Sequence, residues 1–207
     1  AQAVGEIERT AENIQQYVQE LRESPEREMR SLLNALNGGF IAPSPGGDAV
    51  RNPNTLPTGR NLFGINAEAT PGVRAWDEGK ALAKSTLDRY YRKHGEYPRK
   101  VSYTFWAGEF IETEGATLAQ ALYMLGVAPV RDGMNRVTDL RLIPSAELGR
   151  PRIDVVVQTS GQLRDVAASR LELLTKAVKM VAQSENDTCG NYVSEGTVES
   201  ERILLEK

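Results

Sequence analysis

The sequence predicts an α/β fold in which strands alternate with helices and most of the strands run parallel. Residues 101–105 alternate apolar and polar side chains with a period of two, which is typical of a strand. Residues 153–157 form a short run rich in β-branched side chains, of the kind found in buried parallel strands. Helical periodicity flanks both segments, and this alternation favours a parallel sheet with crossover connections.

Residues 1–36 are predicted to form two helices. The first carries an apolar stripe at steps of three and four residues, made of Val4, Ile7, Ala11, Ile14, Val18 and Leu21. Ser24-Pro25-Glu26 combines a capping residue, a first-position proline and an early acid, which predicts the start of the second helix. We expect its buried face to consist of Met29, Leu32, Leu33 and Leu36.

Residues 37–66 are predicted to form an extended loop, because Asn, Gly and Pro dominate and no regular period survives. A loop of this length is uncommon inside a compact domain and is usually functional or disordered. Apolar residues within it favour an ordered loop that packs onto the body and presents polar groups; they are Phe40, Ile41, Leu56, Leu62 and Phe63.

Residues 67–183 are predicted to form a Rossmann-like α/β domain with a mostly parallel sheet and flanking helices. The expected helices cover residues 71–93, about 116–125, and 164–183. The expected strands cover residues 101–105, 127–130, 140–143 and 153–157. Residues 184–207 form a polar tail with a weak signal for a short helix from about residue 197 to 206.

Composition excludes several classes of function. The net charge of −3 gives nucleic-acid binding no electrostatic support, and no apolar stretch is long enough to span a bilayer. Cys189 is the single cysteine and His94 the single histidine, which leaves almost no basis for a zinc site of Cys and His. The chain begins at Ala1 without a signal peptide, so we expect a piece of a longer cytoplasmic protein, and a membrane anchor elsewhere in that protein stays open.

Residues 106–115 form a polar turn after a predicted strand, at the strand end where ligands bind in such sheets. Glu109, Glu112 and Glu114 crowd this turn beside Trp106. Crowded carboxylates raise at least one pKa, which suits proton transfer, and their oxygens suit a hard divalent ion. The alternative is that these acids are solvated and favour the positive end of the next helix.

A second polar turn, residues 158–165, follows the β-branched strand and opens a helix. Backbone N–H groups at a helix start bind anions, so a small-anion or nucleotide-binding domain is one hypothesis. It ranks last, because the sequence has neither a GxGxxG nor a Walker pattern. Ser160 is equally well explained as a helix cap.

Two further segments carry arginines. Arg150 and Arg152 flank a proline before the β-branched strand, where they favour either a ligand carboxylate or a structural ion pair with a neighbouring acid. In the loop, residues 45–48 and 56–61 combine glycines with Arg60 and Asn61. Glycine allows close approach to a ligand or another domain, and the alternative is a pair of tight turns with Arg60 in a surface salt bridge.

At these motifs the sequence resembles the large subunit of cobaltochelatase and the homologous porphyrin-binding subunit of magnesium chelatase. The resemblance runs from about residue 36 to about residue 182, and its joint spacing of motifs is specific. Two departures stand out: Trp106-Ala107-Gly108-Glu109 replaces the usual Trp-Gly-Thr-(Glu/Asp), and Leu163 replaces a usual Phe. The matching motifs are Pro45-Gly46-Gly47-Asp48, Pro57-Thr58-Gly59-Arg60-Asn61, Glu96-Tyr97-Pro98, residues 115–122, Gly126-Val127, residues 148–155 and Ser160-Gly161.

The resemblance implies a fragment of a tetrapyrrole-binding subunit that works with separate AAA+ subunits. Those partners hydrolyse ATP, and the divalent metal, Co²⁺ or Mg²⁺, is a substrate. The resemblance also implies that the fragment alone is inactive. Two alternatives stay open: removal of metal from haem by a relative of the same family, and a non-catalytic scaffold that docks the AAA+ partners and the rest of its own large subunit.

The resemblance also suggests roles for the residues singled out above. Acids are expected to act as bases or ion relays during metal insertion: Glu109, Glu112 and Glu114. Trp106 is expected to stack on the macrocycle. Polar and basic residues are expected to hold the ring and its acidic arms: Arg60, Asn61, Arg152, Ser160 and Arg164.

Overall fold

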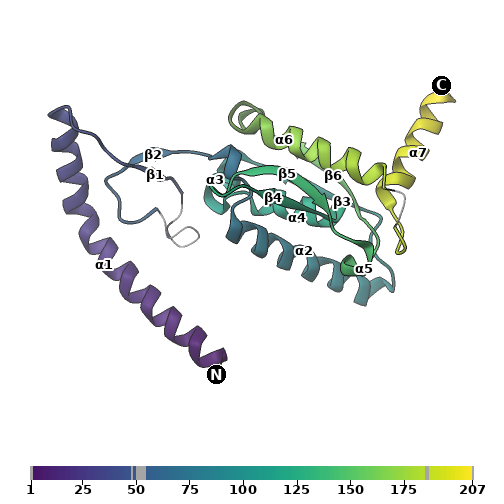
Figure 1. The fold of residues 1–207 in the computed structure, drawn as a ribbon, viewed down its shortest axis with the longest axis horizontal. Helices are drawn as coiled ribbons and strands as arrows, with labels where there is room; N and C mark the ends of the chain where they lie inside the picture. Colours follow the sequence, from purple (N-terminus) through teal and green to yellow (C-terminus); the bar gives the residue numbers. More distant parts are fainter. Residues whose placement is uncertain (1, 48, 50–54, 185–186, 207) are drawn as a thin grey trace. The chain divides into compact units, whose positions relative to one another are not determined.

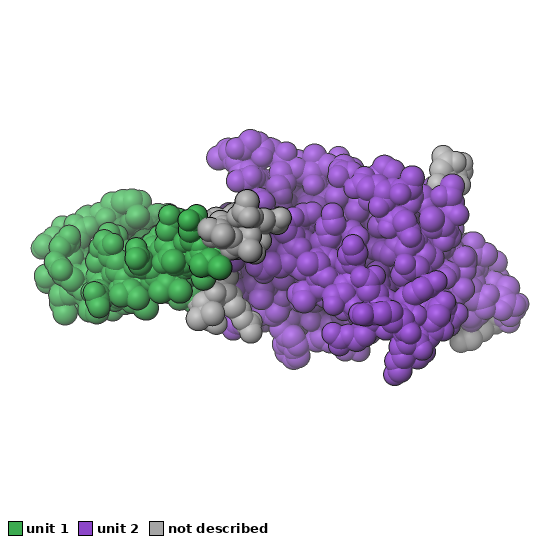
Figure 2. Space-filling view, turned by 90° about the horizontal axis from the view of Figure 1, so that it is seen from below, with its two compact units in different colours: residues 1–64 green, residues 65–207 purple. Residues whose placement is uncertain are grey.

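The computed structural model describes residues 2–47, 49, 55–184 and 187–206. The chain divides into two compact units, residues 1–64 and residues 65–207, which Figure 2 shows in different colours. We describe each unit by itself.

Unit 1 begins with one continuous helix, α1 (Gln2–Leu36), so the prediction of two helices is wrong. Pro25 lies inside this helix rather than at the start of a new one. A proline in a helix removes one backbone donor, and here the helical turns on both sides continue past it. The Ser24 hydroxyl donates to the Glu20 carbonyl oxygen at 2.8 Å, one turn back, instead of capping a second helix.

The apolar stripe of α1 is exposed, so the expected burial of its second half is also wrong. Leu36 is 76% exposed, and Met29, Leu32 and Leu33 are each more than half exposed. The loop meets α1 at Ser24, which is buried, rather than along this stripe.

The described part of the loop is ordered and packs on α1. Its strands β1 (Pro43–Pro45) and β2 (Asn61–Phe63) form a short parallel pair. The Thr58 N–H donates to the Ser24 hydroxyl at 3.0 Å. Gly59 has a φ of +83°, and a Cβ there would lie 2.7 Å from the Arg27 carbonyl carbon, so only glycine fits.

The expected apolar anchors of the loop are only partly correct. Leu56 is buried, whereas Phe40 and Leu62 are exposed. In the motif at residues 45–48, Asp48 lies outside the described residues.

Unit 2 contains the α/β body. In Figure 1, α2 and α6 run along opposite sides of this body, with the strands and α4 between them. In chain order its elements are η2 (Ala67–Ala69), α2 (Val73–His94), β3 (Lys100–Phe105), α3 (Ala107–Thr113), α4 (Ala116–Leu125), β4 (Val127–Arg131), β5 (Val137–Leu142), α5 (Ser145–Leu148), β6 (Asp154–Thr159), α6 (Gly161–Ala182) and α7 (Tyr192–Leu205).

The predicted α/β class is confirmed, and its strands form separate pairs. β3 and β6 are parallel, in a register that runs from Lys100 opposite Asp154 to Phe105 opposite Thr159. β4 and β5 are antiparallel neighbours joined by a hairpin. β6 is less buried than its β-branched sequence suggests, and Val156 is exposed, because the outward face of this two-stranded sheet is open.

Helix α4 forms the centre of the core. All of its residues except Thr117 and Gln120 are buried. Gly79 lets α2 approach it closely, since a Cβ at that position would lie 2.6 Å from the Ala116 carbonyl oxygen and from the Ala119 Cβ. The predicted helix over residues 116–125 is therefore confirmed, and its almost uniformly apolar sequence is explained by burial on all sides.

The last helix, α7, is longer than the short helix expected over residues 197–206. Its start is fixed by Asn191, whose side-chain oxygen accepts from the Val193 and Ser194 N–H groups, each at 3.1 Å. Asn191 is a strong capping residue, and the following apolar pattern was too weak to reveal the cap's position.

Candidate functional site

The two predicted polar turns lie side by side at the carboxyl ends of β3 and β6. The last residues of these strands, Phe105 and Thr159, are paired. The Ser160 N–H donates to the Phe105 carbonyl oxygen at 3.1 Å, which places Ser160 next to the residue after it, Trp106. The carboxyl edge of a parallel pair is where α/β proteins bind ligands.

Trp106 is 60% exposed at this edge. Its backbone is extended, with a φ of −112°, and its carbonyl oxygen accepts the first helical bond of α3, from the Phe110 N–H at 3.1 Å, so Trp106 occupies the N-cap position without a side-chain capping bond. A large, exposed aromatic side chain at this edge is suited to stacking on a flat ring.

Ser160 and Arg164 open helix α6 at the same edge. The Ser160 hydroxyl accepts from the Leu163 N–H at 3.2 Å, so the capping alternative describes its side chain. Arg164 lies in the first turn and is exposed. The guanidinium group can therefore reach an anion outside the protein, with the geometry that suits a carboxylate.

The acidic segment is a helix, α3, rather than a turn. Glu109 points back into the protein, where its Oε1 accepts from the hydroxyls of Thr113 at 2.7 Å and Thr117 at 2.8 Å. The Thr117 N–H also donates to Oε1, at 3.2 Å. Glu109 thereby caps the start of α4, where Gly115 offers no side chain. Its Oε2 is buried without a hydrogen-bond partner among the described residues.

Glu112 and Glu114 are half-buried in the same corner. Glu114 and Gly115 both adopt left-handed backbone conformations, with φ of 54° and 84°, and turn the chain from α3 into α4. The Gly72 N–H donates to the Glu114 carbonyl oxygen at 2.9 Å. The corner is therefore braced by the segment that precedes α2.

Two arginines that were not predicted hold that bracing segment in place. Arg170 is buried and donates to the Thr70 carbonyl oxygen at 3.0 Å, and Arg131 donates to the Pro71 carbonyl oxygen. Burial lowers the pKa of both guanidinium groups. Arg170 also pairs with the Glu68 carboxylate at 3.4 Å. No motif in the sequence distinguishes the two arginines, because the carbonyls of Thr70 and Pro71 lie far from both in the chain.

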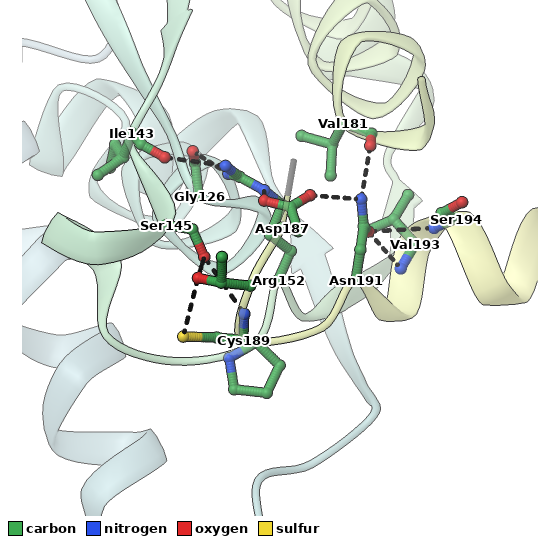
Figure 3. A network of polar contacts seen from close by, with 12 residues as sticks. Gly126, Ile143, Ser145, Arg152, Val181, Asp187, Cys189, Asn191, Val193 and Ser194 are labelled. Carbon is green, nitrogen blue, oxygen red and sulfur yellow. Dashed lines mark hydrogen bonds and ion pairs between the residues drawn. The ribbon is translucent and has the colours of Figure 1, made fainter. Parts of the chain in front are cut away.

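Arg152 is buried in a network of polar contacts shown in Figure 3. Its Nε donates to Asp187 at 2.6 Å, its Nη1 to the Gly126 carbonyl oxygen at 2.6 Å and its Nη2 to the Ile143 carbonyl oxygen at 2.8 Å. Of the two alternatives for Arg152, the structure supports the ion pair, because the residue is 2% exposed and all three guanidinium nitrogens donate to protein acceptors.

Arg150 acts beside it. Its guanidinium donates to the Met124 carbonyl oxygen at 3.2 Å and lies over the Tyr123 ring, 4.8 Å from the centroid. Burial lowers the pKa of Arg150. Both arginines therefore meet carbonyls at the C-terminal end of α4, where a helix has orphan acceptors and a partial negative charge.

The remaining predicted residues, Arg60 and Asn61, belong to unit 1. The Arg60 guanidinium donates to the carbonyl oxygens of Leu56 at 2.8 Å and Pro57 at 3.1 Å. Asn61 is exposed at the start of β2. The structure thus brings Trp106, Ser160 and Arg164 together at one edge of unit 2, with the acidic corner on the adjoining helix.

Across residues 2–47, 49, 55–184 and 187–206, no three His, Cys, Asp or Glu side chains come together as metal ligands. The acids of α3 therefore do not form a closed metal cage. An open groove between β5 and the second half of α6 is lined by Leu142, Leu171, Lys176 and Met180, and none of the predicted site residues lines it. No helix in the described part of the chain is both long and apolar enough to cross a membrane.

The chain matches the family model described as CobN/Magnesium Chelatase over residues 2–207. This match spans nearly the whole chain and includes the carboxyl edge of β3 and β6. The chain belongs to the CobN/magnesium chelatase family.

Named relatives include both kinds of enzyme in this family. The chain is 41% identical over 180 residues to the chloroplastic magnesium-chelatase subunit ChlH of Oryza sativa subsp. indica, which covers 86% of the chain and 13% of that protein. It is 37% identical over 181 residues to the aerobic cobaltochelatase subunit CobN of Sinorhizobium sp, covering 86% of the chain and 14% of that protein.

A solved structure shows the same fold. The catalytic subunit of cobaltochelatase from Mycobacterium tuberculosis superimposes with a TM-score of 0.73 and 40% sequence identity, over 85% of this chain and 15% of that one. The chain therefore spans about one seventh of the length of the relatives that it matches.

Proposed function

We propose that this chain supplies a tetrapyrrole-contacting part of a metal-chelatase large subunit that inserts Co²⁺ or Mg²⁺ into a corrin or porphyrin precursor. The observation that carries the proposal is that the exposed Trp106, after β3, and the exposed Arg164, in the first turn of α6 after β6, both lie at the carboxyl edge of this strand pair. A flat aromatic surface next to a cation matches the two parts of a tetrapyrrole, which are its macrocycle and its acidic arms. The names of the relatives, magnesium chelatase and cobaltochelatase, support the reaction and the two candidate metals.

Metal insertion must remove two pyrrole protons and strip water from the ion. Trp106 would stack on the ring and hold its plane, and Arg164 would hold a carboxylate arm by a bidentate contact. The α3 corner would supply carboxylates that accept protons or pass the ion along, from Glu112 and Glu114. ATP would act through AAA+ partner subunits that bind elsewhere on the large subunit.

A second candidate is a scaffold role, which the exposed apolar stripe of α1 favours. Contiguous apolar surface of this kind marks a protein contact. In that case the chain would dock AAA+ subunits or other parts of its own large subunit, without touching the ring. Removal of metal from haem by the same fold is the alternative for the direction of the reaction.

A fluorescence titration tests the proposal. The chain has two tryptophans, so a Trp76→Phe background leaves Trp106 as the emitter. Saturable quenching of Trp106 by a porphyrin or a corrin precursor is expected. For variants of Trp106, binding is measured by the emission of the ring itself. Trp106→Phe should retain ring binding. Trp106→Ala should weaken ring binding about tenfold or more, since stacking on a base-sized ring contributes about 1–3 kcal/mol.

Arg164→Ala should weaken binding of a carboxylate-bearing ring and leave a ring with amidated arms unaffected. Arg89→Ala on the exposed face of α2 is the matched control, because it removes the same charge away from the edge. Absence of saturable binding with both rings would contradict the ring-contacting role and favour the scaffold.

A further inference from the structure

The three acids of the α3 corner are not equivalent. Glu109 Oε1 accepts from the Thr117 hydroxyl at 2.8 Å and from the Thr117 N–H at 3.2 Å. The Thr113 hydroxyl shares its one hydrogen between Oε1 at 2.7 Å and the Glu109 carbonyl oxygen at 2.8 Å. A carboxylate oxygen has two lone pairs, so Oε1 has no capacity left for a substrate. Oε2 is buried. Neither oxygen of Glu109 is presented to a ring bound at the exposed edge.

The contacts of Glu109 instead join two helices. Glu109 lies in the first turn of α3, and Thr117 lies in the first turn of α4. Between them the chain reverses through the left-handed residues Glu114 and Gly115. Gly115 stands at the capping position of α4 and has no side chain to offer, so the carboxylate of Glu109 takes over that function.

Helix α3 depends on such contacts for its orientation. It has seven residues, and an isolated helix of that length is not stable in water. On one side it is fixed by Phe110, which is buried and lies 5.2 Å from the Phe105 ring between centroids. On the other side it is fixed by Glu109. Trp106 is the residue that caps this helix.

We propose that Glu109 is a positioning residue, held by Thr117, that fixes helix α3 and thereby the exposed ring of Trp106. This inference rests on the proposed function, since it assigns Glu109 a role in the same site. It removes Glu109 from the groups that exchange protons with the substrate and leaves Glu112 and Glu114 as the candidates in the α3 corner. Thr117 becomes a residue of the site, because its hydroxyl donates to Glu109.

The two roles of Glu109 give opposite results for one isosteric change. Glu109→Gln keeps an acceptor at the Oε1 position and abolishes the negative charge. If Glu109 is a positioning residue, the protein tolerates Glu109→Gln. The amide oxygen of glutamine can accept the bonds that Oε1 accepts, and the amide nitrogen takes the place of Oε2, which has no hydrogen-bond partner among the described residues. Thr117→Val removes the hydroxyl donor while keeping the shape, and Thr117→Ser restores it.

The experiment measures Trp106 in the Trp76→Phe background, by fluorescence anisotropy and by ring affinity. Glu109→Gln and Thr117→Ser should match the parent. Glu109→Ala and Thr117→Val should lower the anisotropy of Trp106 and weaken ring binding about tenfold, because each removes a hydrogen bond that joins α3 to the start of α4. Thr175→Val is the control, since the Thr175 hydroxyl donates to the Leu171 carbonyl oxygen on the exposed side of α6.

Far-UV circular dichroism and thermal unfolding of each variant identify any variant that fails to fold. If Glu109→Ala or Thr117→Val fails to fold, Glu109→Gln and Thr117→Ser can still be compared with the parent. A Glu109→Gln variant as impaired as Glu109→Ala, together with an unchanged Thr117→Val variant, would overturn the positioning role and assign the effect to the charge. The anisotropy needs no ligand. If the parent binds no ring, the proposed function fails, and the anisotropy of Thr117→Val still decides whether Glu109 and Thr117 position Trp106.

Discussion

Buried arginines hold the body of unit 2 together at the scale of single residues. Arg150 and Arg152 meet the C-terminal carbonyls of α4, and Arg131 and Arg170 hold the segment before α2. Each guanidinium donates to backbone carbonyl oxygens at a helix end or in a loop, and some of these oxygens, such as that of Gly126, also accept from a backbone N–H. The arginines near the site are therefore divided between framework and surface, and Arg164 belongs to the surface.

Arg152→Ala should destabilise the fold rather than only weaken ring binding. It would leave Asp187, whose side chain is 5% exposed, without its cation, and would remove a charged donor from the carbonyl oxygens of Gly126 and Ile143. Breaking a buried pair in this way costs about 3–5 kcal/mol. Urea unfolding at neutral pH measures the change, and Arg141→Ala on the exposed side of β5 is the control. A loss below about 1 kcal/mol would contradict the framework role.

Tyr103 gives a pH-dependent signature of the packed core. Burial raises the pKa of Tyr103 to about 12, with a smaller opposing effect of the nearby Arg150 cation. The folded state therefore holds this proton more tightly than the unfolded chain, whose tyrosine pKa is about 10. Stability linked to Tyr103 is fully present below about pH 10 and is lost as the pH rises towards 12.

Unfolding free energies of the parent and of Tyr103→Phe should therefore converge or cross between pH 10 and 12, since phenylalanine has no proton to lose. The difference between the two proteins isolates Tyr103 from the other groups that titrate there. A difference that stays constant over this range would show that Tyr103 is not held in its neutral form by burial.

At the scale of elements, the corner between α3 and α4 requires glycine. Gly115 has a φ of +84°, and a Cβ there would lie 2.4 Å from the Thr70 Cγ2. Gly115→Ala should therefore destabilise the protein by about 1–3 kcal/mol through backbone strain and the clash. Gly108→Ala should do the opposite and stabilise it by about 0.5–1 kcal/mol, because Gly108 lies in α3 with open space around it.

Thermal unfolding of the two alanine variants gives a direct comparison at positions seven residues apart. Equal effects of the two substitutions would contradict the assigned backbone geometry of this corner, whatever their sign.

The sequence predicted well those elements whose own hydrophobic pattern is enough to identify them as a helix or a strand. The alternation in β3 and the uniform apolar run of α4 identify each without reference to the rest of the chain. Helix α3 was missed because its stability comes from the distant contacts of Phe110 and Glu109 rather than from its seven residues. The break expected at Pro25 was wrong because one missing donor does not end a helix whose flanking turns are strong.

The same limit applies to the candidate site. The position of Trp106 and Ser160 after two predicted strands was enough to place them at one edge, since parallel strands end together. The direction of each side chain was not predictable. Arg152 turns inward to Asp187 and Arg164 outward to solvent, although both are arginines next to the same strand.

At the scale of the whole molecule, the chain is two units with different surface character. Unit 1 exposes an apolar helix stripe, and unit 2 presents the carboxyl edge with its aromatic and cationic groups. The family assignment covers both units, and the ring-contacting proposal concerns unit 2. The scaffold and the ring-contacting roles can therefore be separated by asking which residues respond to a tetrapyrrole.

Hydrogen exchange of the chain with and without a saturating porphyrin or corrin precursor asks that question most directly. Added ring should slow exchange in residues 106–115 and 160–165, at the carboxyl edge of β3 and β6, and leave residues 148–152 unchanged because they are already buried or bonded to the framework. Protection confined to the groove between β5 and α6, or to α1, with no change at residues 106–115 and 160–165, would contradict the assignment of this edge as the ring-contacting surface.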